Sequence, residues 1–537
     1  MYGEVVECEL PDHSNPVAVK CISLARAADA QTRVQGTREI DNPLQEQRVA
    51  ALLAANGGHR NLRESTHQHS GRTRGAVANA SSTARRLLST HGVGIAHRDL
   101  SLENVLLSRG VCKITDFGLS KDARRYDPAL VDVWSLGIMW FILLTGSPLL
   151  PLASPSTKGF KAVAQDGDSV ARFAADVIQP SVRSMDEAGE MTPEVIQGLF
   201  DNGLLSVEIP MEYGGVGASF MSLILTIEEL SRVDASVGLL CDLQNTVVSN
   251  VFLRYGTEEQ RQEYLPRLST NTVGSFCLTE AEAGSDAFSL KTRADVSADG
   301  SYYTLNGEKM WISNVAHADV FLVMANVDPS MGYKGITCFI VERDTPGLSF
   351  GPPEKKLGLN ASSTCSVILE DVKIPKEKVL GKVGQGYAIA IGQLNEGRIG
   401  IAAQQLGIAE GAYRHAMPYL FERKQFGRAI GDFQAMQHQY AELAVDLASA
   451  RLLVYNAARL KDAGHEFVKA SCMAKLHASR VAERTSSKCI ELLGGVGFSK
   501  QLMAEKFYRD CKVGTIYGGT SNVQLSTIAR LIKQELV

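Results

Sequence analysis

The sequence predicts a multi-domain protein in which a helical domain, a small β domain and a helical bundle follow an incomplete α+β segment. The chain has 537 residues, enough for several domains of about 100–200 residues each. Apolar residues recur at helical spacing across 163–275 and again across 386–537, whereas residues 276–385 alternate with a period of two. Residues 1–150 hold short strand-like and helical runs, and a linker containing Pro and Ser, 151–162, follows them.

Composition is that of an ordinary globular protein and excludes several function classes. Hydrophobic residues make up 45% of the chain and charged residues 21%, as in typical soluble domains. The formal net charge of -4 gives no electrostatic basis for binding nucleic acid. The ten cysteines contain no CxxC pair, so we expect neither a disulfide framework nor a zinc site, and no other metal site is indicated.

Two features of the N-terminal third bear on location. No presequence is visible, because the first ten residues hold three glutamates and no apolar core. Residues 133–157 carry no charge, but serines, glycines and prolines interrupt them, which argues against a membrane span. We expect a buried helix at 133–144 instead.

Residues 1–150 contain motifs that resemble those of protein kinases. VAVK at 17–20 is similar to the strand that presents the phosphate-pairing lysine, and residues 3–6 would form the strand that pairs with it. HRDL at 97–100 is similar to the catalytic loop, and DFG at 116–118 to the metal-binding turn. The resemblance implies phosphoryl-transfer roles for Lys20, Asp99, Asn104 and Asp116.

The kinase-like segment is too incomplete for phosphoryl transfer. The chain begins inside the glycine-rich loop, and the segment between Gly118 and Asp132 is too short for an activation loop. The insert at 62–90 is rich in Arg and Ser and has no apolar periodicity, which predicts disorder. We therefore interpret residues 1–150 as a truncated kinase fragment, either degraded in a real fusion or wrongly joined in a gene model.

In the predicted helical domain, apolar side chains fall on one face at residues 170–178 and indicate a helix that Pro180 ends. Residues 223–231 and 237–255 predict two further helices. The stretch PMEYGGVG at 210–217 predicts a glycine-rich loop before these two helices.

In the predicted β domain, alternation replaces the helical spacing. Strands are predicted at 302–305, 320–324, 336–341 and 366–369, and Asn306-Gly307 is predicted to be a turn after the first of them. Strands of this length and number indicate a small β-barrel or a sandwich.

Long helical repeats return after residue 386. Helices are predicted at 391–413 and 471–493, and between them apolar side chains recur every three or four positions, at Tyr440, Leu443, Leu447, Ala450, Val454 and Ala457. The stretch 509–525 is predicted to be strand-like or looped, with a turn at 518–522 before a C-terminal helix.

Short sequences spread along residues 163–537 together resemble the signatures of acyl-CoA dehydrogenases. In chain order they are PMEYGG, FCLTEAEAGSDA, WIS, RKQFG, ELLGG and RDCKVGTIYGGTSNVQL. The resemblance is closest to the short/branched-chain branch of that family, on the stretches NEGRIGIAAQ, GYKGIT, ASSTC and SKCIELLGGVG. It implies an α-domain, a β-barrel domain and an α-helical bundle like those of that family.

This resemblance implies that the protein holds FAD. The loop 276–287 and Trp311 would face the flavin ring, and Arg423 and Gln434 would reach the diphosphate and adenosine of a neighbouring subunit's cofactor. The implied cofactor-binding residues are Leu278, Thr279, Gly284, Ser285, Trp311, Ile312, Ser313, Arg423, Gln434, Glu491, Leu492, Leu493, Gly494, Gly495, Thr520, Ser521 and Asn522.

The resemblance also implies the family reaction, in which a glutamate takes the α-proton of an acyl-CoA while the β-hydrogen leaves as hydride. The usual glutamate position is Gly518 here, and the position that other members use is Gly397. Glu396 is adjacent, but one residue along a helix turns a side chain by about 100°, so it should point elsewhere. The implied substrate-binding residues are Ala287, Tyr333, Tyr387, Asn395, Glu396, Gly397, Arg398 and Gly519.

Three functions are compatible with these observations. The first is FAD-dependent α,β-dehydrogenation of short or branched-chain acyl-CoA thioesters, as in fatty-acid or isoleucine catabolism, slowed by the missing glutamate and served by Glu396 or water. The second is a catalytically inactive flavoprotein that binds FAD and acyl-CoA, and the third is a kinase-like interaction module at the N-terminus. From the resemblance we expect a homotetramer in the mitochondrial matrix that passes electrons to an electron-transferring flavoprotein.

Overall fold

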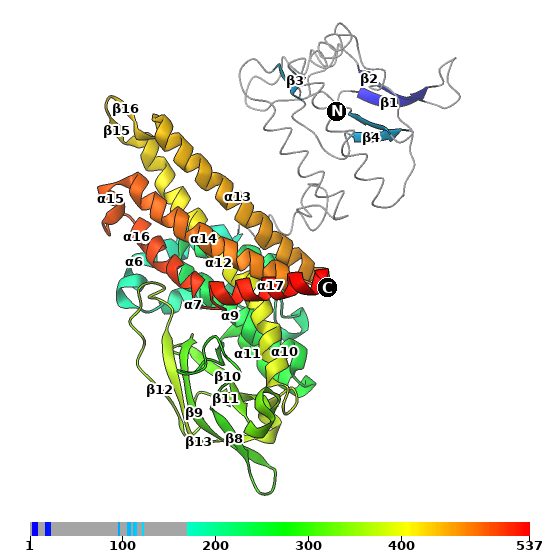
Figure 1. Ribbon diagram of the computed structural model, residues 1–537, viewed down its shortest axis with the longest axis vertical. Helices are drawn as coiled ribbons and strands as arrows, with labels where there is room; N and C mark the ends of the chain where they lie inside the picture. Colours follow the sequence, from blue (N-terminus) through cyan, green and yellow to red (C-terminus); the bar gives the residue numbers. More distant parts are fainter. Residues whose placement is uncertain are drawn as a thin grey trace. The chain divides into compact units, whose positions relative to one another are not determined.

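The computed structural model describes residues 169–537 and six short strands within residues 1–160 (Figure 1). The chain forms two compact units, Met1–Phe160 and Lys161–Val537.

In the first unit, the predicted N-terminal strand pair is confirmed. β1 (Gly3–Cys8) and β2 (Val17–Ile22) pair antiparallel, with Val5 opposite Lys20. Two further antiparallel pairs are present, β3 (Ile95–Ala96) with β6 (Lys121–Asp122) and β4 (Val105–Ser108) with β5 (Val111–Ile114). The following predictions lie outside the described residues: Asp99, Asn104, Asp116, the insert 62–90 and the helix 133–144.

The second unit begins with helices whose buried side chains contribute to two apolar clusters. They are α6 (Gln179–Ala188), α7 (Pro193–Asp201), α8 (Phe220–Val233), α9 (Ala235–Leu243), α10 (Asn250–Tyr255) and α11 (Glu258–Thr270). A π-helical turn, η5 (Gln244–Ser249), joins α9 to α10 without a break, so the helical prediction at 237–255 is confirmed.

The prediction that Pro180 ends the first helix is wrong. Ala174–Ile178 form a π-helical turn whose bonds reach five residues back, and the N–H of Gln179 donates to the Ala174 carbonyl. Pro180 follows in the first turn of α6, where a missing N–H is tolerated. The chain therefore stays helical to Ala188.

The central part is one eight-stranded sheet, as Figure 1 shows below the bundle. Its strand order is β12-β13-β9-β8-β10-β11-β14, with β7 beside β10. The strands are β7 (Val273–Cys277), β8 (Arg293–Val296), β9 (Tyr302–Ser313), β10 (Ala318–Asn326), β11 (Ile336–Glu342), β12 (Leu348–Phe350), β13 (Thr364–Pro375) and β14 (Val379–Leu380). β10 is buried almost throughout, because other elements cover both of its faces.

The predicted turn at Asn306-Gly307 is also wrong. Both residues lie inside β9, opposite an irregular register of β13, and the Asn306 side-chain amide donates to Asp371 at 3.0 Å. Gly307 has φ 151°, and a Cβ there would overlap Thr292, so the glycine serves close packing in a strand irregularity.

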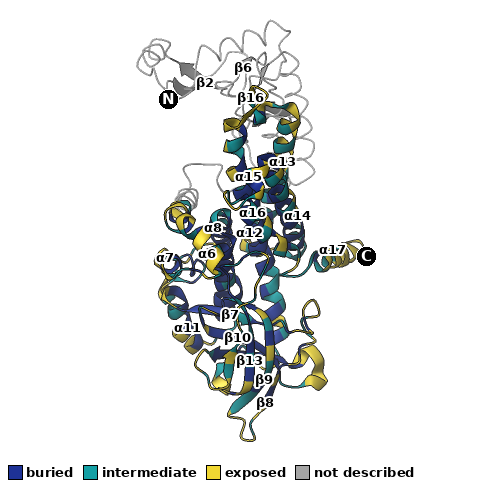
Figure 2. Cartoon of the chain, turned by 90° about the vertical axis from the view of Figure 1, so that its left-hand side faces the viewer, coloured by how far each residue is buried: buried dark blue, intermediate teal, exposed yellow. Residues whose placement is uncertain are grey.

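The C-terminal bundle is built on α12 (Gly386–Glu422), α13 (Gln434–Asp462) and α14 (Val468–Leu493). Short helices α15 (Gly495–Phe498), α16 (Ala504–Cys511) and α17 (Ser521–Leu536) complete it. Figure 2 shows α12 dark along much of its length, because α8, α9, α13, α14 and α16 surround it. The predicted α13 repeat is confirmed at Leu443, Leu447, Ala450, Val454 and Ala457, which are buried, whereas Tyr440 is half-buried.

The stretch 509–525, predicted to be strand-like or looped, is mostly helical. It holds the end of α16, a 3-10 turn (Lys512–Thr515) and the start of α17, with the glycine turn between them. Its β-branched residues suit a strand locally, but packing against α12 and α14 decides the conformation.

A buried ion cluster ties the C-terminal stretch to the rest of the unit. The Lys506 ammonium lies 2.5 Å from Asp510 and 3.0 Å from Asp234 at the start of α9. The second oxygen of Asp510 accepts the Leu359 N–H at 2.7 Å, from the loop before β13. Removing one partner of such a cluster leaves a buried charge unpaired, so the cluster holds the helical and β parts in one arrangement.

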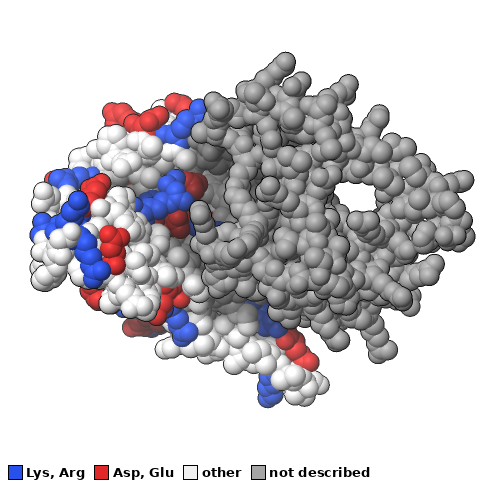
Figure 3. Space-filling view, turned by 90° about the horizontal axis from the view of Figure 1, so that it is seen from above, with Lys and Arg blue, Asp and Glu red and all other residues white. Residues whose placement is uncertain are grey.

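Acidic and basic side chains of the described residues lie intermixed on the face shown in Figure 3. Among the helices that the structure describes, none combines the length and apolarity that a membrane crossing requires. Across residues 169–537, no three His, Cys, Asp or Glu side chains gather as metal ligands do.

Candidate active site

Trp311 on β9 has a conformation that L residues rarely adopt. Its φ is +61°, and 52% of the side chain is exposed in this chain. The next residue, Ile312, is buried in the core and anchors the strand. A large aromatic side chain that is held in a strained backbone and left open to solvent is characteristic of a ligand site.

The loop after β7 lies against this strand. The Met310 N–H donates to the Thr279 carbonyl at 2.9 Å, and Ser275 Oγ donates to the Ser313 carbonyl at 2.8 Å. The structure thus brings together the two segments predicted to face a flavin. Within residues 169–537, no protein atom bonds to the hydroxyls of Thr279, Ser285 and Ser313.

A buried ion pair that the sequence analysis missed organises this loop. Lys309 on β9 is fully buried, and its ammonium donates to Glu280 at 2.7 Å and to the Leu278 carbonyl at 3.2 Å. Burial alone would raise the pKa of Glu280, but Lys309 and the Lys291 N–H hold it below its usual range. The available signal was a lysine at an inward position of an alternating strand.

Three aromatic rings form a second cluster from separate segments. The Tyr333 and Tyr387 ring centres are 4.6 Å apart, and Phe288 lies 4.4 Å from Tyr387. Ala287 is half-buried beside them, next to Phe288 in the chain. The structure therefore unites the predicted substrate residues Ala287, Tyr333 and Tyr387, and adds Phe288.

Side chains of the 395–398 segment of α12 lie on two sides of the helix. Arg398 donates to Asn395 Oδ1 at 2.6 Å, and both residues belong to the predicted substrate set. Glu396 is 2% exposed and forms an ion pair with Arg254 of α10, while Lys461 of α13 lies 3.8 Å away. Glu396 is thus neutralised on the side of α12 that faces α10 and α13.

The Gly518-Gly519 turn is held by side chains from two helices. Both glycines have positive φ, 59° and 85°. Lys475 of α14 donates to the Gly519 carbonyl at 2.8 Å, and the Gln524 amide donates to the Gly518 and Gly519 carbonyls at 3.1 and 2.9 Å. Burial lowers the pKa of Lys475 to about 8. The sequence analysis missed this anchor, whose only signal was a lysine on the inner face of α14.

The two glycines at the possible base positions differ in the room around them. A Cβ at Gly518 would overlap Cδ1 of Ile401 on α12. A Cβ at Gly397, one helical turn before Ile401, would make ordinary contacts of 3.6 Å with Val247 and 3.8 Å with Thr246 Oγ1. The two positions therefore converge on one face of α12, and neither carries a carboxylate.

Family models match three consecutive parts of the second unit. They are the N-terminal, middle and C-terminal domains of acyl-CoA dehydrogenase, at residues 166–272, 275–372 and 384–533. The mitochondrial short/branched chain specific acyl-CoA dehydrogenase of Rattus norvegicus is 58% identical over 367 residues, which cover 68% of this chain and 84% of the relative. The chain belongs to the acyl-CoA dehydrogenase family.

Solved structures agree with this assignment. A chain in the structure of the electron transferring flavoprotein of Acidaminococcus fermentans matches with a TM-score of 0.68 and 40% identity, covering 69% of this chain and 97% of that one. A glutaryl-CoA dehydrogenase from Mycobacterium smegmatis in complex with FADH2 matches with a TM-score of 0.66 and 30% identity, covering 69% and 94%. A protein tyrosine and serine/threonine kinase model matches residues 59–130, which supports the kinase fragment.

The residues of this acyl-CoA dehydrogenase fit FAD, the cofactor of its family. Trp311 supplies an exposed aromatic surface for the face of a flavin ring. The hydroxyls of Thr279, Ser285 and Ser313, which bond to no described protein atom, supply hydrogen-bond donors for its edge. Leu492 and Leu493 are buried in the bundle core, so their side chains are not available to a cofactor, whereas Gly494 and Gly495 are exposed.

Arg423 and Gln434 lie far from Trp311 within one chain. Both are exposed and flank the hairpin of β15 (Lys424–Gln425) and β16 (Arg428–Ala429). Figures 1 and 2 both show this hairpin at one end of the bundle and the sheet at the other. The structure therefore does not bring these predicted cofactor residues together with the flavin-facing segments of the same chain.

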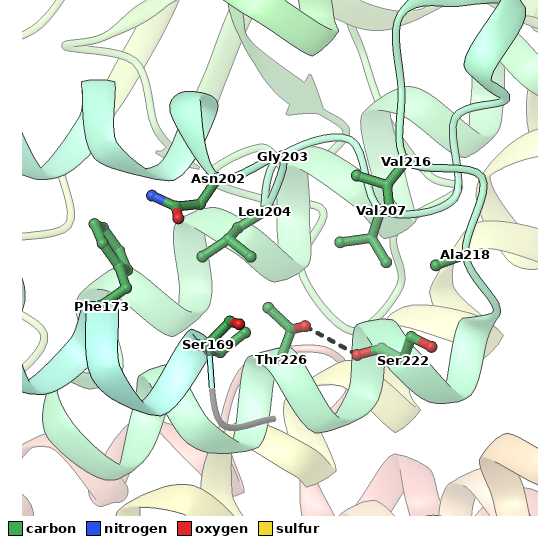
Figure 4. Close-up of a pocket in the computed structure, with 11 residues that line it drawn as sticks. Ser169, Phe173, Asn202, Gly203, Leu204, Val207, Val216, Ala218, Ser222 and Thr226 are labelled. Carbon is green, nitrogen blue, oxygen red and sulfur yellow. Dashed lines mark hydrogen bonds between the residues drawn. The ribbon is translucent and has the colours of Figure 1, made fainter. Parts of the chain in front are cut away.

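One small cavity lies among the N-terminal helices, away from the predicted site residues. Its volume is about 90 Å³, and Phe173, Leu204, Val207, Val216 and Thr226 are among the side chains around it (Figure 4). None of the predicted cofactor or substrate residues lines it.

Proposed function

We propose that residues 163–537, with domains beginning at 163, 276 and 386, carry out FAD-dependent α,β-dehydrogenation of a short or branched-chain acyl-CoA thioester. FAD, when bound, would supply the acceptor for the hydride of the β-carbon. The chain itself binds the thioester, excludes water and must accept the α-proton. The observation that carries the proposal is the joint presence of the strained, open Trp311 and the Phe288, Tyr333 and Tyr387 cluster in a chain 58% identical to an enzyme of this specificity.

The predicted roles fit this geometry. We assign the flavin edge to Thr279, Ser285 and Ser313, and the ring face to Trp311. We assign the thioester to the aromatic cluster, to the 395–398 segment of α12 and to Gly519. Thr520 caps α17 by accepting the Val523 N–H at 3.3 Å, and Asn522 in the first turn of α17 is exposed, so we assign the Asn522 side chain and the start of α17 to the diphosphate.

We propose that turnover is slow. The usual base positions are Gly518 and Gly397, and Glu396 is neutralised by Arg254. General-base catalysis contributes a factor of about 10²–10⁴ to the rate of a proton abstraction. The missing glutamate should therefore slow turnover by up to about this factor. The same observation supports the second candidate, a flavoprotein that binds FAD and acyl-CoA without turning over.

We further propose that the cofactor site is completed by another copy of the chain. Arg423 and Gln434 lie at the opposite end of the bundle from Trp311, and Phe426 in the hairpin between them is 94% exposed. A homotetramer in the mitochondrial matrix, with an electron-transferring flavoprotein as acceptor, accords with the mitochondrial rat relative and with the Acidaminococcus structure.

Anaerobic titration of the purified protein with 2-methylbutyryl-CoA tests the function. Loss of the flavin absorbance within minutes supports dehydrogenation. Binding of both FAD and the thioester without bleaching supports the second candidate. A purified protein that retains no flavin contradicts both.

A further inference from the structure

Asp242 near the end of α9 is a buried carboxylate that the family signatures do not include. It is fully buried, and the Thr246 hydroxyl can donate either to its Oδ1, at 3.0 Å, or to its backbone carbonyl, at 2.8 Å. Its Oδ2 is buried without a hydrogen-bond partner, and no Lys, Arg or His of residues 169–537 pairs with it. The neighbouring groups are Cys241, Thr246, the Gly400 backbone and Tyr517.

The carboxylate packs on the face of α12 that carries the empty base positions. A Cβ at Gly400 would overlap both oxygens of Asp242, so the glycine allows the carboxylate to touch the helix backbone. Gly397 lies one turn earlier, and a Cβ there would be 3.8 Å from Thr246 Oγ1. The Thr246 hydroxyl therefore lies between the Gly397 position and Asp242.

Other carboxylates near this face are neutralised. Glu396 pairs with Arg254, and Glu228 accepts hydrogen bonds from Arg451 and Tyr455 at 2.9 and 2.8 Å. Burial raises the pKa of Asp242 to about 7, the range in which a carboxylate can both take and release a proton at neutral pH. Asp242 thus combines position, an unused oxygen and the absence of a cation.

We propose that Asp242 accepts the α-proton through the Thr246 hydroxyl, in place of the glutamate that the chain lacks. The Cα–H bond breaks and its proton goes to Thr246 Oγ1, while the proton of Thr246 passes to Asp242 Oδ1. The bonding electron pair stays on the thioester as its enolate. The inference rests on the proposed function, because that function places the thioester beside Gly397.

The test separates α-deprotonation from hydride loss. 3-Thiabutyryl-CoA carries sulfur at the β-position, so it can form an enolate but cannot lose a hydride. Stopped-flow absorbance then follows enolate formation in the FAD-loaded protein. We expect Asp242→Asn and Thr246→Val to slow it by about 10²–10⁴, with flavin content and thioester binding retained.

Two further variants separate proton transfer from folding. Thr226→Val is the matched control, because Thr226, like Thr246, donates to the carbonyl four residues back, at 2.9 and 2.8 Å, but has no carboxylate as a second partner. It should leave the rate unchanged. Gly397→Glu added to Asp242→Asn should restore enolate formation, since a new base makes the relay unnecessary, whereas a purely structural loss would persist.

The outcomes are distinct. Enolate formation at the unmodified rate in Asp242→Asn overturns the proposal, as does its absence in the unmodified protein that binds both FAD and the thioester. If Asp242→Asn does not fold, Thr246→Val decides alone, and an unchanged rate there overturns the proposal. Failure of the unmodified protein to bind FAD or the thioester instead contradicts the proposed function itself.

Discussion

A glutamate introduced at Gly397 should increase activity with less loss of stability than one introduced at Gly518. Gly397 lies in regular helix, where a Cβ meets only ordinary contacts of 3.6 and 3.8 Å. Gly518 has φ +59°, which costs an L residue about 1–2 kcal/mol, and a Cβ there must displace Ile401 Cδ1. Gly397→Glu should therefore fold as well as the unmodified protein, and Gly518→Glu should be less stable.

The expected gain follows from the chemistry of a general base. A carboxylate at position 397 would be buried, which raises its pKa toward neutrality and makes it a competent base. In the Asp242→Asn background, where the proposed relay is absent, we expect Gly397→Glu to accelerate flavin bleaching by 2-methylbutyryl-CoA by about 10²–10⁴, equivalent to about 3–5 kcal/mol off the barrier. Anaerobic stopped-flow measurements at saturating thioester would give the rate.

Gly397→Gln is the matched control, since it has the same shape without the basic oxygen. In the same Asp242→Asn background it should leave the rate at the level of Asp242→Asn alone. Equal acceleration by Gln and Glu would refute the reasoning, because packing rather than proton transfer would then be responsible. No acceleration by Glu, with flavin and thioester bound, would refute it as well.

Three further predictions concern other parts of the site. Trp311→Ala should reduce the flavin retained on purification while leaving the melting temperature of the apoprotein nearly unchanged, because the indole is 52% exposed; unchanged flavin content would contradict its assigned place. Lys309→Met should lower the free energy of unfolding by about 3–5 kcal/mol in guanidinium titrations, since Glu280 would be left as a buried, unpaired charge, and a loss below 1 kcal/mol would contradict that account. Folding raises the pKa of Asp242 from 3.8 to about 7, so the folded state binds more protons and the free energy of unfolding should fall as pH rises through this range. Relative to Asp242→Asn, the unmodified protein should lose up to about 4 kcal/mol of that free energy between pH 4 and pH 8. A difference in unfolding free energy between the two proteins that stays constant with pH would refute the raised pKa.

Local patterns in the sequence were sufficient to predict most of the helices and strands. The repeat from Leu443 to Ala457 predicts α13 because a helix returns every third or fourth side chain to one face. The short runs of mostly apolar residues at 320–324 and 336–341 likewise mark β10 and β11, which are buried on both faces. These patterns fail where packing overrides propensity, as at Pro180 and Asn306.

The sequence by itself determined the family, the order of the structural parts and the absence of glutamate at positions 397 and 518. Each of these depends on residue identity along the chain. Only the tertiary structure decided that Glu396 is neutralised by Arg254, that Lys309 organises the flavin loop and that Asp242 lies uncompensated beneath Gly400. Those facts depend on which distant side chains meet, and on how far water is excluded where they do.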